Sequence, residues 1–186
     1  MSFHSRLLLL PGLNNSGEDH WQTHWEKKLG CERVEQENWD TPVMEKWIGC
    51  IEKYAMRGSL DDLILVARSL SCCSVAFWHA RYGHAIRGAF LVGPSDTEAP
   101  TYPPGTTGFK PMPLNRLPFP SLVVASSDDF YVTLPRAQQF ADAWGSRLLN
   151  IGNAGHINTA SGFGTWPAGL ELLQEFESSI LSKNKL

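Results

Sequence analysis

The sequence predicts an α/β fold built around a largely parallel β-sheet. Along the whole chain, short apolar runs alternate with segments whose apolar residues recur at helical spacing. One of the runs, residues 63–66, is apolar throughout, which is typical of a central strand buried on both faces. The chain of 186 residues is long enough for one domain with a sizeable core. We therefore expect a single domain over residues 1–186.

Six segments are expected to form the strands of this sheet. Each is a short run rich in apolar residues that ends near Pro, Gly or polar residues, and the second is the weakest. In chain order the predicted strands cover residues 6–10, 31–36, 63–66, 87–92, 121–125 and 147–151.

Five or six helices are expected between and after these strands. Trp21, Trp25 and Leu29 recur at four-residue spacing and so mark one face of the first helix. The fourth helix has Pro135 in its first turn, a position that tolerates proline because no intrahelical N–H is needed there. Beyond the first helix, the predicted helices cover residues 43–54, 72–82, 134–144 and 167–181.

Composition and charge exclude several classes of function. The net charge of −3 and the pI near 6.1 argue against a nucleic-acid or anionic membrane surface, both of which need basic patches. No apolar run approaches the roughly 20 residues that span a bilayer, and the N-terminal residues lack a signal-peptide pattern. The adjacent Cys72 and Cys73 suit neither a disulfide framework nor a zinc knuckle, so we expect reduced thiols and a cytoplasmic location.

The segment of residues 94–120 differs from the rest of the chain. It contains eight of the twelve prolines and shows no sustained periodicity. A loop this long is usually functional or disordered, and this one follows the carboxyl end of a predicted strand, where α/β sheets bind ligands. We interpret it as a cap-like loop over the site. The alternative is a proline-stiffened connection without ligand contact.

Ser69 is the candidate nucleophile. The apolar run of residues 63–66 leads into Ala67-Arg68-Ser69-Leu70-Ser71, and a helical segment follows. This is the layout of a nucleophile elbow, a sharp strand-to-helix turn that needs small residues two positions before and two after the serine. Ala67 and Ser71 are small, although neither is the glycine of the strict motif. Alternatively, Ser69 only caps the following helix.

A candidate acid and a candidate base follow Ser69 in the chain. Asp128 and Asp129 come directly after the predicted strand of residues 121–125, and the pattern alone does not separate them. His156 lies in a glycine-bearing loop after the last predicted strand. An imidazole placed there can accept the serine proton, and a carboxylate can orient the imidazole. An Asp or a His in such a loop can also serve only as a turn or capping residue.

Backbone N–H groups for the negative oxygen of a tetrahedral intermediate are expected from Leu70 and Leu13. Leu13 belongs to the loop after the first predicted strand. This loop has Gly12 and Gly17 at the spacing of a phosphate-binding motif, but Glu18-Asp19 follow instead of Lys and Ser or Thr. Two acids there would repel phosphate, so we expect no nucleotide cofactor.

Metal binding is also not expected. The pairs His20/His24 and His79/Cys73 can be placed at helical spacing, but neither has the further ligands that a zinc site requires.

In these residues and the motifs around them, the chain resembles the small serine hydrolases of the retinoblastoma-binding protein 9 family, most closely their bacterial branch. The resemblance covers nearly the whole length. Its motifs are residues 10–17 with His20-Trp21-Gln22, the Ser69 elbow, residues 127–132, residues 155–158, and residues 161–167.

The resemblance implies a compact α/β-hydrolase fold, a three-layer α/β/α sandwich with strand order 2-1-3-4-5-6. It also implies that Ser69 is the nucleophile, Asp129 the acid and His156 the base. The family usually has histidine at the position of Arg68 and glycine at that of Ser71. Arg68 would then bind a substrate carboxylate or pair with an acid.

Two hypotheses on function follow. The first is a serine hydrolase, esterase-like, that cleaves a small ester, thioester or amide through an acyl-enzyme on Ser69, with Arg68 and Asn14 as candidate substrate contacts. The second is a catalytically weak module on the same scaffold that holds a protein partner. In the first case the partner of the site is a small-molecule acyl substrate, without nucleic acid, membrane or cofactor.

Overall fold

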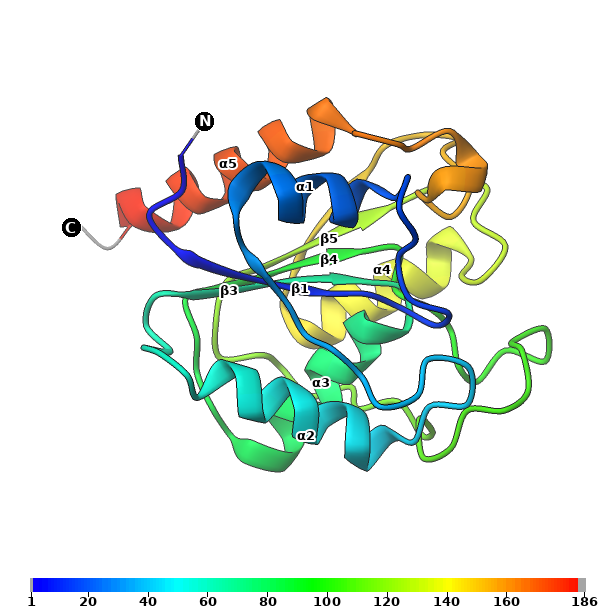
Figure 1. Ribbon diagram of the computed structural model, residues 1–186. Helices are drawn as coiled ribbons and strands as arrows, with labels where there is room; N and C mark the ends of the chain where they lie inside the picture. The colour runs from blue at the N-terminus through cyan, green and yellow to red at the C-terminus, as the bar shows by residue number, and fades with distance from the viewer. Residues whose placement is uncertain (1, 184–186) are drawn as a thin grey trace.

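The computed structural model describes residues 2–183, which form a six-stranded sheet between two layers of helices (Figure 1). Every pair of neighbouring strands is parallel, and the strand order is β2-β1-β3-β4-β5-β6. The predicted fold class and strand order are confirmed. In chain order the strands are β1 (Arg6–Leu10), β2 (Glu32–Arg33), β3 (Leu63–Arg68), β4 (Gly88–Val92), β5 (Ser121–Ala125) and β6 (Arg147–Asn150).

The helices divide between the two faces of the sheet. Helices α1 (Trp21–Leu29) and α5 (Pro167–Lys183) pack on one face, where Trp21 and Trp25 meet Leu170 and Leu173 in one apolar cluster. The opposite face is covered by α2 (Met44–Ala55), α3 (Leu70–Tyr82) and α4 (Leu134–Trp144). The structure is therefore the three-layer sandwich that the sequence predicts.

Strand β3 shows why its sequence is apolar without alternation. Leu63 and Leu65 pack in the cluster under α2, α3 and α4, whereas Ile64 and Val66 pack in the cluster under α1 and α5. All four side chains are fully buried. A strand with helices on both faces must be apolar on both, and this strand lies between β1 and β4 in the middle of the sheet.

Two bounds differ from the prediction in an informative way. Strand β2 has only two residues, in place of the predicted span 31–36, and it is an edge strand that pairs with β1 alone. Strand β3 instead continues to Arg68, and the Ser69 N–H then donates to the Val92 carbonyl at 2.9 Å. The sheet pairing thus runs up to the elbow and holds Ser69 at the carboxyl edge.

The segment of residues 94–120 contacts the site only in its first part. Ser95 and Tyr102 line the cavity described below. Further along, Thr107 forms a bridge with the residue before α2, and Phe109 is buried with its ring edge-on to two aromatic rings of α2 and α3. The Pro113 carbonyl accepts a hydrogen bond from α4. Most of the segment is therefore a packed connection along the helices.

Two observations concern the environment of the protein. Within residues 2–183, no helix has both the length and the apolar character needed to cross a membrane. The four cysteines are free thiols, and burial raises the pKa of the adjacent Cys72 and Cys73. These thiols are therefore protonated at neutral pH. The cytoplasmic location stays a prediction.

Candidate active site

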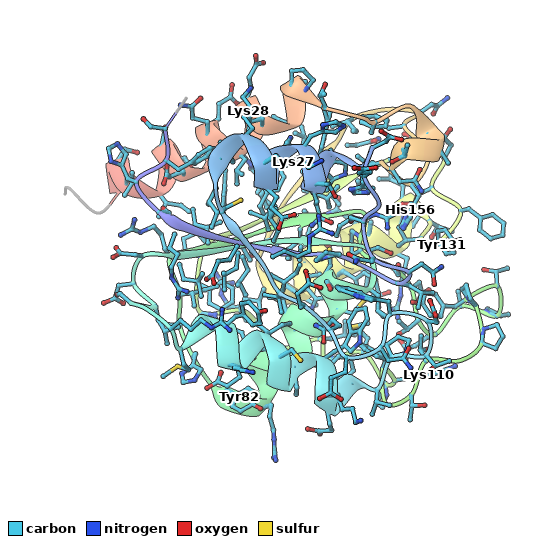
Figure 2. All side chains as sticks on the ribbon, viewed as in Figure 1. Lys27, Lys28, Tyr82, Lys110, Tyr131 and His156 are labelled. Carbon is cyan, nitrogen blue, oxygen red and sulfur yellow. The ribbon has the colours of Figure 1, made fainter. Side chains whose placement is uncertain are left out.

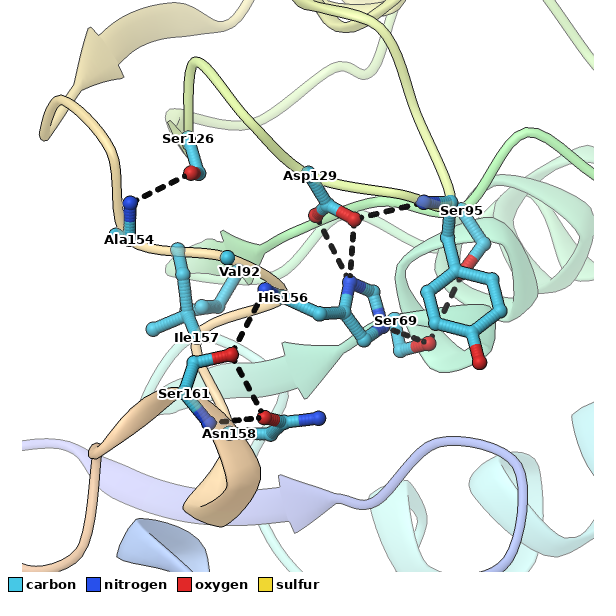
Figure 3. Close-up of polar contacts among 12 residues, drawn as sticks. Ser69, Val92, Ser95, Ser126, Asp129, Ala154, His156, Ile157, Asn158 and Ser161 are labelled. Carbon is cyan, nitrogen blue, oxygen red and sulfur yellow. Dashed lines mark hydrogen bonds and ion pairs between the residues drawn. The ribbon is translucent and has the colours of Figure 1, made fainter.

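Ser69 occupies a strained turn between β3 and α3. Its φ of 58° and ψ of −125° place a non-glycine residue in a region that side chains rarely adopt. The Ser69 hydroxyl makes no capping hydrogen bond to the helix that follows. Instead, Ser69 Oγ lies 2.9 Å from His156 Nε2 and 2.9 Å from Ser95 Oγ (Figure 3). The hydroxyl therefore faces a base and not the end of the helix.

The loop after β1 is seated directly against this turn. A Cβ atom added to Gly12 would lie 2.7 Å from Ser69 Cβ, so only glycine fits there without displacement. The Ser71 hydroxyl donates to the Pro11 carbonyl at 2.5 Å. Ser71, which stands where the resembled family has glycine, thus ties the elbow to this loop.

Asp129 is hydrogen-bonded to the other side of the His156 ring. His156 Nδ1 lies 2.9 and 2.8 Å from the two carboxylate oxygens of Asp129 (Figure 3). The Tyr131 N–H donates to Asp129 Oδ1 at 2.9 Å, and the Tyr131 ring lies 4.5 Å from the His156 ring. With Nδ1–H donating to the carboxylate, Nε2 is free to accept the Ser69 hydroxyl proton. Figure 2 shows His156 and Tyr131 together at one end of the molecule.

Asp128 makes a different set of contacts. Its Oδ1 accepts hydrogen bonds from the Ser126 hydroxyl at 2.7 Å and from the Gly155 N–H at 2.8 Å. These two donors lower the pKa of the Asp128 carboxyl, with the Ser126 bond the larger cause. Asp128 therefore joins the loop after β5 to the loop that carries His156, and the structure separates two neighbours that the sequence pattern leaves equivalent.

The loop that carries His156 is also held from its other side. Trp21 Nε1 on α1 donates to the Ile157 carbonyl at 2.9 Å in a buried hydrogen bond. The His156 N–H donates to the Ser161 hydroxyl at 3.1 Å, and that hydroxyl donates to Asn158 Oδ1 at 2.9 Å (Figure 3). Ser161 ends a single 3₁₀ turn (Thr159–Ser161) that the sequence pattern does not reveal. The imidazole is therefore positioned by the fold and does not depend on a ligand.

Burial lowers the pKa of His156 below its ordinary value. The hydrogen bond that His156 donates to Asp129 opposes this effect, and the positive charge of Arg68 adds to it. Because the lowered pKa favours the neutral imidazole, His156 is unprotonated at neutral pH and can act as a proton acceptor.

The two candidate oxyanion donors are Leu70, the residue after Ser69, and Leu13, in the loop after β1. Leu70 is the first residue of α3, where a backbone N–H has no intrahelical acceptor. Leu13 lies in the loop that Gly12 seats against the elbow, and it lines the same cavity as Ser69. The two residues after it, Asn14 and Asn15, both have a φ of 64°, so the loop turns sharply here.

A cavity of about 320 Å³ opens over Ser69 and His156. Of the sequence-predicted residues, Leu13, Asn14 and Arg68 also line it. Further lining residues that sequence reasoning did not assign to the site include His20, Ser95, Tyr102 and Tyr131, which come from the segments after β1, β4 and β5 and meet only in the folded chain. Within the described residues, no group of three or more His, Cys, Asp or Glu side chains is arranged to hold a metal ion.

The fold and the site together define the class of protein. A parallel sheet of this order, with a serine on a strained strand-to-helix turn at its carboxyl edge, is the α/β-hydrolase arrangement. The chain belongs to the serine hydrolase family, which it matches over residues 7–175. It is thus a small hydrolase of the α/β-hydrolase superfamily. The narrower resemblance to retinoblastoma-binding protein 9 stays a prediction.

Solved structures resemble the chain over almost its full length. A protein described as a YdeN-like hydrolase from Pectobacterium atrosepticum is 30% identical, with a TM-score of 0.83 over 95% of this chain and 92% of its own. The ydeN gene product of Bacillus subtilis is 21% identical, with a TM-score of 0.78 over 94% and 99%. The esterase RhEst1 from Rhodococcus sp. shares the fold at 15% identity, with a TM-score of 0.70 over 95% and 91%. No curated protein matches the sequence.

Proposed function

We propose that the protein hydrolyses a small carboxylic ester, thioester or amide through an acyl-enzyme on Ser69. The observation that carries this proposal is the continuous hydrogen-bonded chain from Ser69 through His156 to Asp129, whose Ser69 end faces a cavity of small-molecule size. A serine hydroxyl is a weak nucleophile unless a base removes its proton, and here the base is neutral, buried and within 2.9 Å.

In the proposed reaction, Ser69 Oγ attacks the carbonyl carbon while His156 Nε2 takes the hydroxyl proton. Asp129 stabilises the imidazolium and keeps Nε2 directed at Ser69. The backbone N–H groups of Leu13 and Leu70 bind the negative oxygen of the tetrahedral intermediate. His156 then gives its proton to the leaving group. Water attacks the acyl-enzyme, with His156 again as the base, and releases the carboxylic acid.

Asn14 and Arg68 are proposed to contact the substrate. Both line the cavity, and the Asn14 side chain is exposed to it from the loop that also carries Leu13. An amide can donate to or accept from a bound acyl compound. The role of Arg68 is developed in the next subsection.

The proposal is tested by labelling with a fluorophosphonate probe, which reacts with activated serines. We expect the wild-type protein to be labelled and Ser69→Ala to be unlabelled, while Ser178→Ala, a change at an exposed serine of α5, stays labelled. Circular dichroism of the unlabelled variant checks its fold. Equal labelling of the wild-type protein and Ser69→Ala would contradict the proposal.

Turnover of 4-nitrophenyl butyrate by the same three proteins separates the two hypotheses on function. A hydrolase loses this turnover with Ser69. A module that only binds a protein partner shows no turnover that depends on Ser69.

A further inference from the structure

The cavity contains a buried cation without a partner. Arg68 is only 6% exposed and lines the cavity next to Ser69. Within residues 2–183 its guanidinium makes no hydrogen bond or ion pair with another residue, and Arg68 Nε is fully buried without an acceptor. Burial lowers the pKa of Arg68 to about 10, so it still carries its charge at neutral pH.

Two more donors in the same cavity also lack an acceptor. His20 Nδ1 accepts a hydrogen bond from the Gln22 N–H at 3.2 Å, which leaves the proton of the neutral ring on Nε2. His20 Nε2 is buried without a partner, and burial and the Arg68 charge lower the pKa of His20 to about 3. The Tyr102 hydroxyl is likewise buried without a partner, and burial raises its pKa. Both groups are thus neutral donors.

No carboxylate in the described chain makes a hydrogen bond or ion pair with Arg68. Asp129 is the acid that most affects Arg68, but its oxygens accept from His156 and from the Tyr131 N–H. Among the described residues that line the cavity there is no Asp or Glu. The cavity therefore has a positive charge and spare donors, without an acidic acceptor.

Arg33 is another buried guanidinium in this chain, and unlike Arg68 it has several hydrogen-bond partners, as expected for a structural role. Its side chain is 8% exposed, and it contacts Glu26 Oε2 at 2.7 Å. It also donates to the side chains of Asn15 and Thr23 and to the Ser16 carbonyl. Burying a charge without such partners is costly, so an unpaired buried cation that faces a cavity is expected where a ligand supplies the acceptor.

We propose that the substrate of this site carries a carboxylate close to its scissile bond, and that the Arg68 guanidinium binds this carboxylate, with His20 Nε2–H and the Tyr102 hydroxyl as neighbouring donors. This inference rests on the proposed function, since it names the substrate class of the same site. The carboxylate belongs either to the acyl group, as in a monoester of a dicarboxylic acid, or to the leaving group. Hydrolysis by water then releases two products, of which one or both are anionic, and Arg68 keeps its proton throughout.

The first test compares matched anionic and neutral esters. For the acyl side, the pair is 4-nitrophenyl hydrogen glutarate and 4-nitrophenyl pentanoate. For the leaving-group side, it is 3-acetoxybenzoate and phenyl acetate. After subtraction of uncatalysed hydrolysis, kcat/KM is measured for wild type, Arg68→Gln and Arg68→Lys. We expect the preference for the anionic member of one pair to fall about 10- to 100-fold in Arg68→Gln, the loss typical of a hydrogen bond to a charged group.

Arg68→Lys keeps the positive charge but lacks the planar guanidinium that can donate two parallel hydrogen bonds to a carboxylate. We therefore expect it to retain part of the preference for the anionic ester. Because the readout is a ratio of two substrates on one protein, a general loss of activity or of folded protein cancels. An equal anion preference in wild type and Arg68→Gln for both pairs overturns the inference. If wild type is labelled by fluorophosphonate in that case, the proposed function stands while the inference fails.

A second test is independent of turnover. Calorimetry measures the binding of monomethyl glutarate, and of its uncharged analogue dimethyl glutarate, to Ser69→Ala and to Ser69→Ala/Arg68→Gln. We expect monomethyl glutarate to bind at least about tenfold more tightly to Ser69→Ala than to Ser69→Ala/Arg68→Gln. Dimethyl glutarate should bind equally to the two proteins. If wild type fails the labelling test, the proposed function is overturned, and this measurement decides whether the anion site exists. Equal binding of the anion to both proteins overturns the site.

Discussion

Two groups of polar side chains lie at one cavity, and they differ in how many of their polar atoms have a hydrogen-bond partner in the protein. Ser69, His156 and Asp129 form a chain in which each polar atom has a partner within 2.9 Å. Arg68 and His20 lie in the same cavity, each with a buried nitrogen that has no partner in the described chain. The first group is positioned without a ligand, whereas the proposed ligand supplies the hydrogen-bond acceptors that the second group lacks.

This difference matches the two tasks of a hydrolase site. A proton acceptor and its orienting carboxylate work best when they need no rearrangement during the reaction, so the fold holds them from both sides. Specificity instead comes from groups that are costly when unpaired and become paired only by the correct substrate. Substitutions in the two groups and next to them test this division.

The largest effect is expected within the pre-formed group. Asp129→Asn should lower kcat/KM for 4-nitrophenyl butyrate by about 10⁴-fold, because the amide stabilises neither the correct tautomer nor the imidazolium. Asp128→Asn is the matched control, since it alters the neighbouring carboxylate that contacts Ser126 and Gly155 instead. We expect a far smaller fall there. Equal losses in the two variants would contradict the assignment of Asp129 to His156.

The packing of the β1 loop against the elbow gives the second prediction. Gly12→Ala should lower the free energy of unfolding by about 1–3 kcal/mol, the usual cost of an added methyl group in a filled space, and should also lower turnover by displacing Ser69. Gly17→Ala adds the same methyl group to the same loop, where no atom lies within 4 Å. Urea unfolding of both variants measures the difference, and equal stabilities would show that the contact is not tight.

The two buried arginines should respond in opposite directions. We expect Arg68→Met to raise the free energy of unfolding by on the order of 1 kcal/mol, because it removes a buried charge that has no partner. Arg33→Met should instead lower it by about 1–3 kcal/mol, because it leaves the acceptors of Arg33 unpaired. Urea unfolding without ligand measures both. A loss of stability in Arg68→Met would mean that Arg68 has a structural role.

The smallest effect is expected in the pH profile. Burial lowers the pKa of His156, so the acid limb of kcat/KM for a neutral ester should lie below pH 6.5, the ordinary value. The Arg68 charge disfavours the imidazolium, so Arg68→Gln should move this limb to higher pH. Rates measured between pH 4 and pH 8 test the shift. A limb that moves to lower pH, or does not move, would contradict electrostatic contact between the two groups.

Much of the fold could be predicted because it depends on local patterns. Strand β3 is apolar on both faces, and Trp21 and Trp25 recur along one face of α1, so their burial follows from periodicity. The length of β2 could not be predicted, because the residues of the span 31–36 do not reveal how many of them pair with β1, the single neighbour of this strand.

The candidate site could be predicted in part. Ser69 and His156 lie next to strand ends, so parallel pairing places them at one edge of the sheet. Sequence reasoning assigned to the site neither His20, although it lies in a motif of the resemblance, nor Tyr102, because their lack of a partner within residues 2–183 is visible only in three dimensions.

Periodicity and residue type were enough to predict the α/β class, the approximate positions of the strands, and the chain order of a serine, a carboxylate and a histidine. The sequence pattern leaves Asp128 and Asp129 equivalent, because both follow the same strand, and only the resemblance implies Asp129. The fold shows that the Asp129 carboxylate reaches the imidazole, whereas Asp128 contacts the Gly155 N–H. The fold also shows that no acid within residues 2–183 is paired directly with Arg68. Whether a charged side chain has an ion-pair partner depends on residues distant in the chain, and only the fold brings these residues together.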